Sequence, residues 1–574
     1  MTADLAGLYV FPGAEPALVA EAWRELRAGC RSGTVRELGP LLLSVGSRHA
    51  SELVIEEGDA RQQTWGLGAA RHGASPELAA PPWLRCDYDA VARRARLRTD
   101  RYGFALLYWR KLPGSVAFST SALLLARVAP RAEPDPGALA ELIAFDQLLG
   151  ERTHARGVSA LPLGHHLLLD PEGAQLQKHG GYSDVPFDPR LPPQVAVTGL
   201  VRAWREALGD LLPRAGSRQV VVPLSGGLDS RLLAATAAEL KAPLQTFTFG
   251  QRLASGAEPP DVVIARRVAA ALGAPWRFLE LKDGWVGDHA ELACQLTDGH
   301  LDVLHSAGVS FSREFQGDLL RLDGLAGDIV LGGSALLRPA LGEHSPAARL
   351  RRLWRARSAI EGAAWQKLLL PDARRELTRH ARAALEQSLV DVTSQLTPSD
   401  PRWLDFWVLR NRIRRFTTNG ALLWRPVAES AFPFFAPQFF DRLLALHPRH
   451  RLGAQLQARF LHEAYPAMAR IPWQKTGRPV PRPGWLGRLT SHLGARHLPP
   501  KRPFFDFDAA LRRSAREQEL FRAHLLGRES LLASLGLFDL AAVARLYDRT
   551  IAGEVKGMKQ LSLLLTLALA RRST

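Results

Sequence analysis

The chain changes its pattern of apolar and polar residues about one third of the way along. Up to about residue 195, short alternating segments are broken by Gly, Pro and Asp, which predicts strands. These segments are 7–11, 41–45, 92–98, 104–109, 115–119 and 166–169. Further on, strand-like runs alternate with helix-like stretches, which predicts a parallel sheet covered by helices. We therefore expect a β-rich α+β domain at 1–195 and a parallel-sheet α/β domain, with extra helices, at 196–574.

The stretch 219–241 joins an expected strand to an expected helix through a glycine turn. An apolar run at 220–224 has the length of a buried parallel strand, and a helical apolar face follows the turn. Backbone N–H groups in such a turn point at an anion, and glycines let a phosphate come close. Hydroxyls can donate to the phosphate, and a carboxylate can hold Mg²⁺. The residues predicted to bind phosphate are Ser225, Gly226, Gly227, Asp229 and Ser230, with Asp229 also a Mg²⁺ ligand.

Other expected elements surround this turn. Strands are predicted at 244–249, 276–281 and 319–322, and helices at 197–212 and 261–272. Because ligands bind at the carboxyl ends of parallel strands, Phe249 is placed where an adenine could stack; core packing is the alternative. Further elements are an amphipathic, aromatic-rich helix at 403–424, a Pro- and Arg-rich loop at 480–505 and a core helix at 561–570.

Length and composition exclude several classes of protein. The 574 residues and 46% hydrophobic content allow two or more domains with sizeable cores. No apolar run is long enough to span a membrane, and the N-terminus shows no signal-peptide pattern. The three cysteines, Cys30, Cys86 and Cys294, have neither metal-ligand spacing nor a disulfide framework. We expect a cytoplasmic protein without a membrane partner.

The formal charge of +17 could indicate an anionic partner. Two arginine-rich runs, 351–357 and 410–415, are candidate binding patches. Such runs are more often solvated faces of helices, and that is the interpretation we prefer.

The turn at 225–230 lacks the lysine of a Walker loop and resembles the pyrophosphate-binding loop of ATP pyrophosphatases. The segments 323–333 and 471–477 look like two further segments of the asparagine synthetase family within that group, and 429–435 looks like a third. The resemblance implies ATP and Mg²⁺, with Asp328 as the second metal ligand. It also implies that Gly324 lies at the nucleotide, that Glu429 lies near the acceptor and that Lys475 contacts the phosphate in the transition state.

The first domain resembles the glutaminase domain of asparagine synthetases, an N-terminal-nucleophile (Ntn) fold, at 98–108, 118–123 and 157–165. That glutaminase uses an N-terminal cysteine, whose α-amine activates the thiol. Here Ala6 stands at the cysteine position and five residues precede it. Thr2 would be N-terminal after methionine removal, but it lies four residues out of register. The resemblance therefore implies a glutaminase-like domain without glutaminase activity.

The resemblance as a whole implies an AMP-forming carbon–nitrogen ligase, as in asparagine biosynthesis, acting on a small-molecule or peptide carboxylate and an amine. Leu325 stands where asparagine synthetases carry a glutamate beside the reacting groups, which disfavours plain asparagine synthesis. The alternatives are an intramolecular amide former (a peptide macrolactam or β-lactam cyclase), a tRNA-modifying enzyme and a non-catalytic ATP-binding protein. We do not expect a nucleic-acid partner, and a homodimer is left open.

Overall fold

The structure of the chain is a computed structural model that describes most of residues 4–572. The ranges left out within it are 31–33, 47–53, 57–61, 69–78, 182–183, 254, 336–341, 343–344, 483–504 and 528–529. Thr2 and most of the predicted loop at 480–505 therefore lie outside the described residues.

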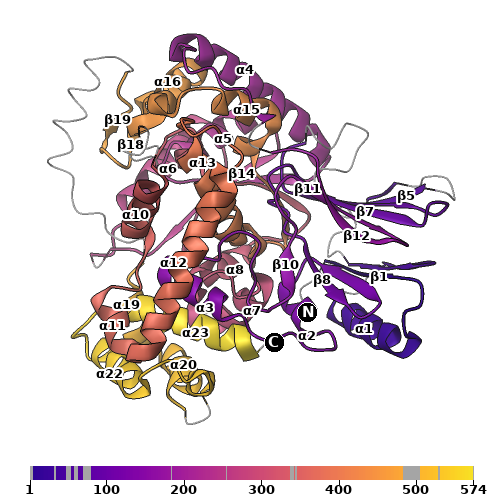
Figure 1. The fold of residues 1–574 in the computed structure, drawn as a ribbon. Coiled ribbons are helices and arrows are strands. Elements are labelled where there is room, and N and C mark those ends of the chain that lie inside the picture. Colours follow the sequence, from indigo (N-terminus) through magenta and orange to yellow (C-terminus); the bar gives the residue numbers. More distant parts are fainter. Residues whose placement is uncertain are drawn as a thin grey trace.

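The N-terminal part contains two six-stranded sheets with antiparallel pairing, which form the right-hand side of Figure 1. The first has the order β10-β8-β9-β1-β3-β2, and the second has the order β12-β11-β7-β6-β5-β4. The strands of the first sheet are β1 (Leu5–Val10), β2 (Thr34–Leu38), β3 (Leu41–Val45), β8 (Tyr108–Leu112), β9 (Ser115–Ser119) and β10 (Val158–Ala160). Those of the second are β4 (Val54–Glu56), β5 (Gln62–Gly68), β6 (Trp83–Asp89), β7 (Arg94–Thr99), β11 (His165–Asp170) and β12 (Gly173–Lys178).

Strand β1 is buried on both sides because it separates two hydrophobic cores. Leu5 and Tyr9 belong to the core that includes side chains of both sheets. Ala6 and Leu8 alternate with them and pack toward α1 (Pro16–Gly29) and α2 (Ala122–Arg127). Side chains alternate between the two faces of a strand, so one short run supplies both cores.

The predicted strands 41–45 and 115–119 are confirmed to the residue, while the one predicted at 104–109 begins only at Tyr108. The reason is Asp100, which is buried and whose carboxylate accepts hydrogen bonds from the N–H groups of Tyr102, Phe104 and Ala105. These bonds fix a turn where the apolar pattern alone favours a strand.

The second half contains the predicted parallel sheet, in the order β15-β14-β13-β16-β17. Its strands are β13 (Gln219–Pro223), β14 (Leu244–Gly250), β15 (Trp276–Glu280), β16 (Leu319–Leu322) and β17 (Ala428–Ala431). The predicted helices are observed as α4 (Pro193–Leu211) and α6 (Pro260–Ala271), and α5 (Asp229–Glu239) follows the glycine turn. Among the five strands of this sheet, β17 is the one that the sequence did not predict. Its four residues include Glu and Ser and show no apolar run.

Helices make up most of the remainder. The predicted helix at 403–424 is a buried series consisting of α13 (Trp403–Trp407), the π-helix η7 (Val408–Thr417) and α14 (Asn419–Leu422). The predicted core helix at the end of the chain is α23 (Met558–Arg572), which is buried from Leu561 to Ala570. The other helices of the second half include α7 (Trp285–Leu296), α8 (Ala307–Ser312), α9 (Gly327–Val330), α10 (Pro346–Arg357), α11 (Ala363–Leu368), α12 (Pro371–Thr393), α15 (Pro437–Leu444), α16 (Gln455–Ala464), α17 (Pro466–Arg470), α19 (Phe507–Arg513), α20 (Ala515–Phe521), α21 (Leu531–Leu535) and α22 (Leu540–Ile551).

The two halves share a large hydrophobic core. Helix α3 (Pro136–Phe145) comes from the N-terminal part but packs against the long helix α12 of the second half. Figure 1 shows α12 crossing the middle of the molecule beside α3, with the C-terminal helices below them. The division at residues 195 and 196 stays a prediction, since packing continues across it.

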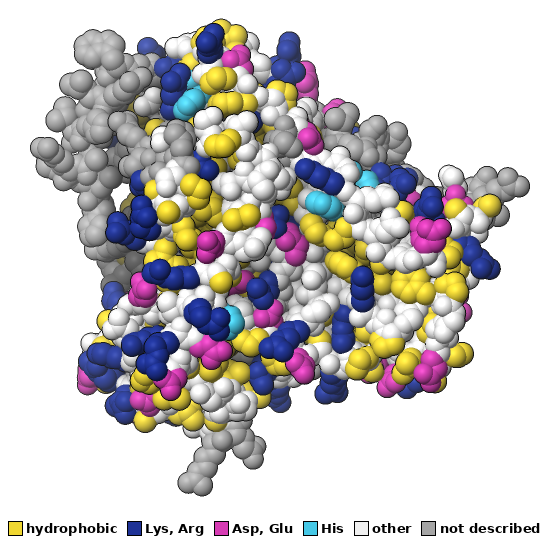
Figure 2. Space-filling view, viewed as in Figure 1, with side chains coloured by type: hydrophobic (Ala, Val, Ile, Leu, Met, Phe, Trp, Pro, Cys, Tyr) yellow, Lys and Arg dark blue, Asp and Glu magenta, His cyan; other side chains and the backbone are white. Residues whose placement is uncertain are grey.

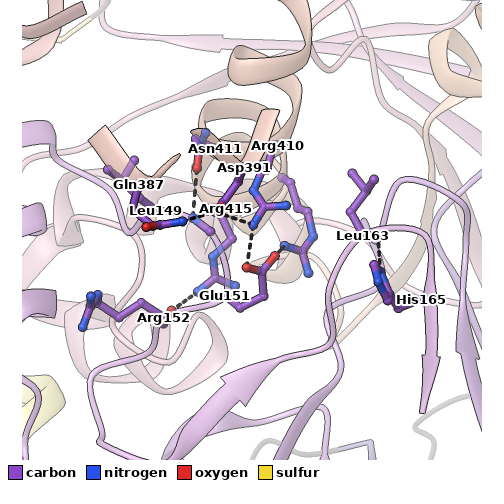
Figure 3. Close-up of polar contacts among 12 residues, drawn as sticks. Leu149, Glu151, Arg152, Leu163, His165, Gln387, Asp391, Arg410, Asn411 and Arg415 are labelled. Carbon is purple, nitrogen blue, oxygen red and sulfur yellow. Dashed lines mark hydrogen bonds and ion pairs between the residues drawn. The ribbon is translucent and has the colours of Figure 1, made fainter. Parts of the chain in front are cut away.

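The arginine run at 410–415 is not a solvated face, and the interpretation that we preferred for it is wrong. Arg410, Arg414 and Arg415 are buried on η7. The guanidinium of Arg410 lies between Glu151 and Asp391, at 2.6 and 3.0 Å, as Figure 3 shows. These arginines tie the N-terminal part to the helical part, which the pattern of charges could not reveal.

The same helix also satisfies backbone groups of the N-terminal part. The guanidinium of Arg414 donates to the carbonyl oxygens of Gly103 and Leu161, at 3.1 and 2.5 Å. Asn411 accepts a hydrogen bond from the N–H of Gly150 at 2.9 Å. Buried polar backbone atoms need such partners, so the polar side chains of η7 connect the N-terminal part to the second half by hydrogen bonds.

The other arginine run, 351–357, agrees better with the solvated-face interpretation. On α10, Arg351 and Arg355 are exposed while Leu353 and Trp354 are buried. Figure 2 shows Lys and Arg side chains spread over the face in view, with Asp and Glu side chains between them. None of the described helices is long and apolar enough to cross a membrane.

Replacing Arg414 by methionine should destabilise the fold. The two carbonyl groups of Gly103 and Leu161 would lose their donors, which costs about 1–3 kcal/mol for each buried group. We expect a thermal midpoint several degrees below that of the wild type, measured by circular dichroism. The matched control is Arg355→Met, an exposed arginine that should leave the midpoint unchanged. Equal midpoints for both variants would show that η7 does not join the two parts.

Candidate functional site

The loop 224–230 between β13 and α5 is closed by its own hydroxyl groups. Ser230 Oγ accepts a hydrogen bond from the N–H of Ser225 at 3.0 Å and lies 3.0 Å from Ser225 Oγ. Ser225 Oγ in turn accepts from the N–H of Gly227 at 3.1 Å. The two serines therefore hold the turn at the carboxyl end of the central strand β13, which is the position for ligand binding in an open parallel sheet.

One N–H group of this turn donates a hydrogen bond to a carboxylate of the protein itself. The N–H of Gly226 donates to Asp261 Oδ1 at 2.7 Å, from the first turn of α6. A Cβ at position 226 would come within 2.8 Å of that oxygen and 3.0 Å of Gln474, so only glycine fits here. An N–H group that binds a carboxylate oxygen is also suited to a phosphate oxygen, since both are anionic acceptors.

The two predicted metal ligands lie side by side. The backbone N–H of Asp328 hydrogen-bonds the carboxylate of Asp229, and Gln457 Nε2 donates to the same carboxylate. Burial, followed by the negative charge of Asp328, raises the pKa of Asp229 to about 8. Gly327 makes this approach feasible, because a Cβ there would lie 2.7 Å from Asp229 Cγ.

This donor set fits a hydrated divalent cation bound to phosphate. Two adjacent carboxylates repel each other when both are ionised, and a divalent cation removes that penalty. Mg²⁺ commonly takes one or two protein carboxylates and completes its octahedron with water and phosphate oxygens. Among the described residues no cluster of three or more His, Cys, Asp or Glu side chains is suited to a metal, so Asp229 and Asp328 remain the candidate ligands.

The loop that carries Lys475 is fastened to the phosphate loop. The N–H of Gln474 donates to the carbonyl of Gly226 at 3.2 Å. Lys475 is exposed, with its ammonium 5.3 Å from the ring centre of Trp473, and its charge acts on Asp229. The resemblance implies that Lys475 contacts the phosphate. In the structure the loop that carries Lys475 lies beside the phosphate loop.

Arg231, which we did not predict as a site residue, holds the lysine loop in place through hydrogen bonds to backbone carbonyls. Its buried guanidinium donates to the carbonyls of Met468, Ile471 and Pro472 at 2.8–2.9 Å, and to Gly226 at 3.2 Å. Burial lowers the pKa of Arg231 to about 10. The only sequence signal is a charged residue directly after the Ser-Gly-Gly-Leu-Asp-Ser turn and before an apolar stretch of the helix.

Phe249, Gly324 and Leu325 border the same end of the sheet. Phe249, the last residue but one of β14, has 37% of its surface exposed and packs on Phe311, with ring centres 4.5 Å apart. The ring is thus half packed and half exposed, and stacking of an adenine on it stays a prediction. Gly324 lies against the phosphate loop, with its Cβ position 3.4 Å from the N–H nitrogen of Ser230. Leu325 is buried in the core.

Glu429 does not join this group. It lies on β17, opposite Leu320 of β16, two residues before the strand ends at Ala431. Its carboxylate pairs with Arg218, which precedes β13, at 2.5 Å, and both side chains are about nine-tenths buried. The pair is therefore displaced from the carboxyl edge of the sheet toward the amino ends of the strands, where it links β17 to β13.

The N-terminal part offers no nucleophile at the position the resemblance marks. Ala6 is fully buried in the middle of β1, between Ser44 and Ser119 of the neighbouring strands. All three cysteines are buried, and none of them forms a disulfide. Burial raises the pKa of Cys294 to about 12 and raises that of Cys86 further, so neither forms a thiolate near neutral pH.

The chain belongs to the asparagine synthase family: the family model described as asparagine synthase matches residues 205–572, more than half of the chain. This range contains the phosphate loop, Asp328 and the lysine loop. The predicted family for the second half is therefore confirmed. The comparison with curated proteins finds no match.

Two solved structures resemble part of the chain weakly. One is a glutamine phosphoribosylpyrophosphate amidotransferase from B. subtilis complexed with ADP and GMP, at 10% identity, covering 48% of this chain and 90% of that one. The other is described as the allosteric regulatory enzyme of purine biosynthesis, at 8% identity, covering 48% and 80%. Both TM-scores are 0.21, too low to carry weight here.

Removing either candidate metal ligand should weaken magnesium-dependent binding of ATP. Asp229→Asn and Asp328→Asn each take away one negative charge that would face the cation. We expect the dissociation constant for ATP with Mg²⁺, measured by isothermal titration calorimetry, to rise at least about tenfold, because a lost charge-assisted contact is worth roughly 1.5–3 kcal/mol. Asp210→Asn, an exposed aspartate on α4, is the control. Wild-type affinity in both site variants would mean that the cation binds elsewhere.

Proposed function

We propose that this protein forms an amide bond at the expense of ATP, through an acyl-adenylate, with release of AMP and pyrophosphate. The observation that carries the proposal is the meeting of Asp229, Asp328 and the Lys475 loop at the glycine turn. Membership of the asparagine synthase family supports the same reaction class. The nature of the carboxylate and of the amine is left open.

In the proposed first step, a carboxylate oxygen of the substrate attacks the α-phosphorus of ATP and pyrophosphate leaves. The N–H groups and hydroxyls of the 225–230 turn bind the departing phosphates. Mg²⁺, held by Asp229 and Asp328, would neutralise charge on the phosphate oxygens. Lys475 stabilises the charge that builds up as the bond to pyrophosphate breaks. In the second step an amine attacks the acyl carbon and AMP leaves.

The buried Ala6 favours an amine that does not come from glutamine. Free ammonia, an external amine or an amine of the same substrate molecule would serve. An intramolecular amide former is therefore the second candidate, since such an enzyme needs no ammonia source. Mass spectrometry separates the two: a cyclised product is the substrate minus one water, whereas an external amine adds its own mass less one water.

The direct test is exchange of labelled pyrophosphate into ATP in the presence of candidate carboxylic acids and peptides. Acid-dependent exchange is expected, because the first step reverses when labelled pyrophosphate replaces the released pyrophosphate while the acyl-adenylate stays bound. An ATP-binding protein without ligase activity would bind ATP with Mg²⁺ but show no exchange with any acid offered. That result would contradict the proposed function.

Lys475→Ala should lower kcat far more than it raises KM for ATP, since its contact strengthens only as charge develops. Losing one preorganised charge contact costs about 10²–10³ in rate, or roughly 3–4 kcal/mol. Lys475→Arg should restore little, because a planar guanidinium does not replace a compact ammonium. In steady-state kinetics, a kcat within a factor of about three of wild type in a folded alanine variant would remove Lys475 from the mechanism.

The protein should not hydrolyse glutamine. Ala6 cannot act as a nucleophile, and the thiols of Cys86 and Cys294 are held protonated by burial. Purified protein with ATP, Mg²⁺ and glutamine should release no glutamate in a coupled dehydrogenase assay. Turnover that disappears in a Thr2→Ala variant would overturn this expectation and assign the role to Thr2.

A further inference from the structure

A cavity of about 190 Å³ lies among helices that take no part in the site described above. It is lined by the end of α3 and the turn after it, and by residues of α10, α11, α13, η7 and α23. None of its lining residues belongs to the phosphate loop, to the loop after β16 or to the Lys475 loop. Any ligand of this cavity would therefore bind apart from ATP.

One part of the wall is apolar and aromatic. Phe145, Trp365, Trp407 and Leu563 line the cavity, and all four are buried. Their positions are fixed by packing in the shared core, and Trp407 Nε1 is satisfied by Ser388 at 2.9 Å. This wall can accept a flat or short hydrocarbon body without rearrangement.

The other part of the wall carries an excess of positive charge. Arg357, Arg412 and Lys559 line the cavity, against a single carboxylate, that of Asp146. Burial lowers the pKa of Arg412 to about 10, and the nearby charge of Arg357 lowers it further while Asp146 opposes this. Burial also lowers the pKa of Arg357, with no carboxylate acting on it. Among the ion pairs of the described residues, none includes Arg357, Arg412 or Lys559.

Two arginines that are buried elsewhere in this protein are neutralised by ion pairs with aspartates. Arg402 pairs with Asp400, at 2.8 Å, and Arg451 pairs with Asp405. Cations withdrawn from water without a counter-charge are costly, and proteins normally pair them. Arg357 and Arg412 are half-buried and Lys559 is exposed, and no ion pair of the described residues includes them, so the positive charge of this wall is available to an anion from solution.

An unsatisfied donor points to the same conclusion. Gln147 lines the cavity, is only 3% exposed, and its Nε2 has no hydrogen-bond partner among the described residues. Its Oε1 accepts from Arg412 at 3.1 Å, which orients the amide so that the nitrogen remains available. Buried amide donors are nearly always satisfied, so this nitrogen is available to an acceptor atom of a bound molecule.

We propose that this cavity binds a small organic anion, whose carboxylate or phosphate group pairs with Arg357, Arg412 and Lys559 and accepts a hydrogen bond from Gln147. The apolar body of the anion packs against Trp365 and Trp407. The volume is below that of typical drug-sized pockets, about 300–1,000 Å³, which excludes a nucleotide and suits a single ring or a short chain. This inference does not depend on the proposed function.

The test uses the full-length protein and four probes at constant ionic strength: benzoate, phenyl phosphate, inorganic phosphate and the neutral benzyl alcohol. Benzoate, phenyl phosphate or both should raise the thermal midpoint saturably, and the alcohol should not. The ratio of the two anions' dissociation constants tells a carboxylate site from a phosphate site. Inorganic phosphate binding as tightly as both would refute the role of the aromatic wall. No saturable shift with any anion would overturn the proposal.

Variants place the binding in this cavity. Arg357→Gln and Arg412→Gln should each weaken anion binding at least tenfold, while Arg355→Gln, an exposed arginine on the same helix α10, should not. Gln147→Met should also weaken it, because the amide nitrogen that donates to the anion is removed. Binding that survives in both arginine variants would place the anion elsewhere and refute the site. A titration by calorimetry on each folded variant gives the dissociation constants.

Discussion

The parallel pairing of β13 with its neighbours is the constraint on which the proposed ATP site depends. Because β13 and β16 run in the same direction, with Val221 opposite Arg321, their following loops emerge at one edge. Asp229 and Asp328, about a hundred residues apart in the chain, therefore meet there. A shift in this register would separate them and leave the phosphate loop without its second carboxylate. The tight approach at Gly327, where a Cβ would strike Asp229, shows how little freedom the pair has.

Buried arginines perform a second structural task, which is to fasten segments that hydrophobic packing alone would leave loosely defined. Arg231 donates to the carbonyls of Met468, Ile471 and Pro472 at the start of the lysine loop, and Arg414 donates to two carbonyls of the N-terminal part. A guanidinium suits this work because its five N–H donors spread in a fixed plane. The arginines at 357 and 412 take part in no ion pair of the described residues, which distinguishes a structural arginine in this protein from one available to a ligand.

Much of the fold could be predicted because local pattern and tertiary structure agree. The Val run, the glycine turn and the helix after it were each visible in sequence, and they are β13, the phosphate loop and α5. Strand β17 could not be predicted, since a four-residue segment containing Glu429 and Ser430 carries no periodic signal. The resemblance also implies that Glu429 lies near the acceptor. Its carboxylate instead pairs with Arg218, a contact between residues far apart in the chain that the sequence could not reveal.

The sequence by itself determined the family, the order of the two halves and the loop that would bind phosphate, because these depend on residues close together in the chain. Only the tertiary structure decided which distant side chains face one another. The arginines at 410–415 look like a charged surface in sequence and are in fact buried, because Glu151 and Asp391 arrive from elsewhere in the chain to neutralise Arg410. Burial and charge compensation are properties of three-dimensional neighbours, and a local pattern contains no information about them.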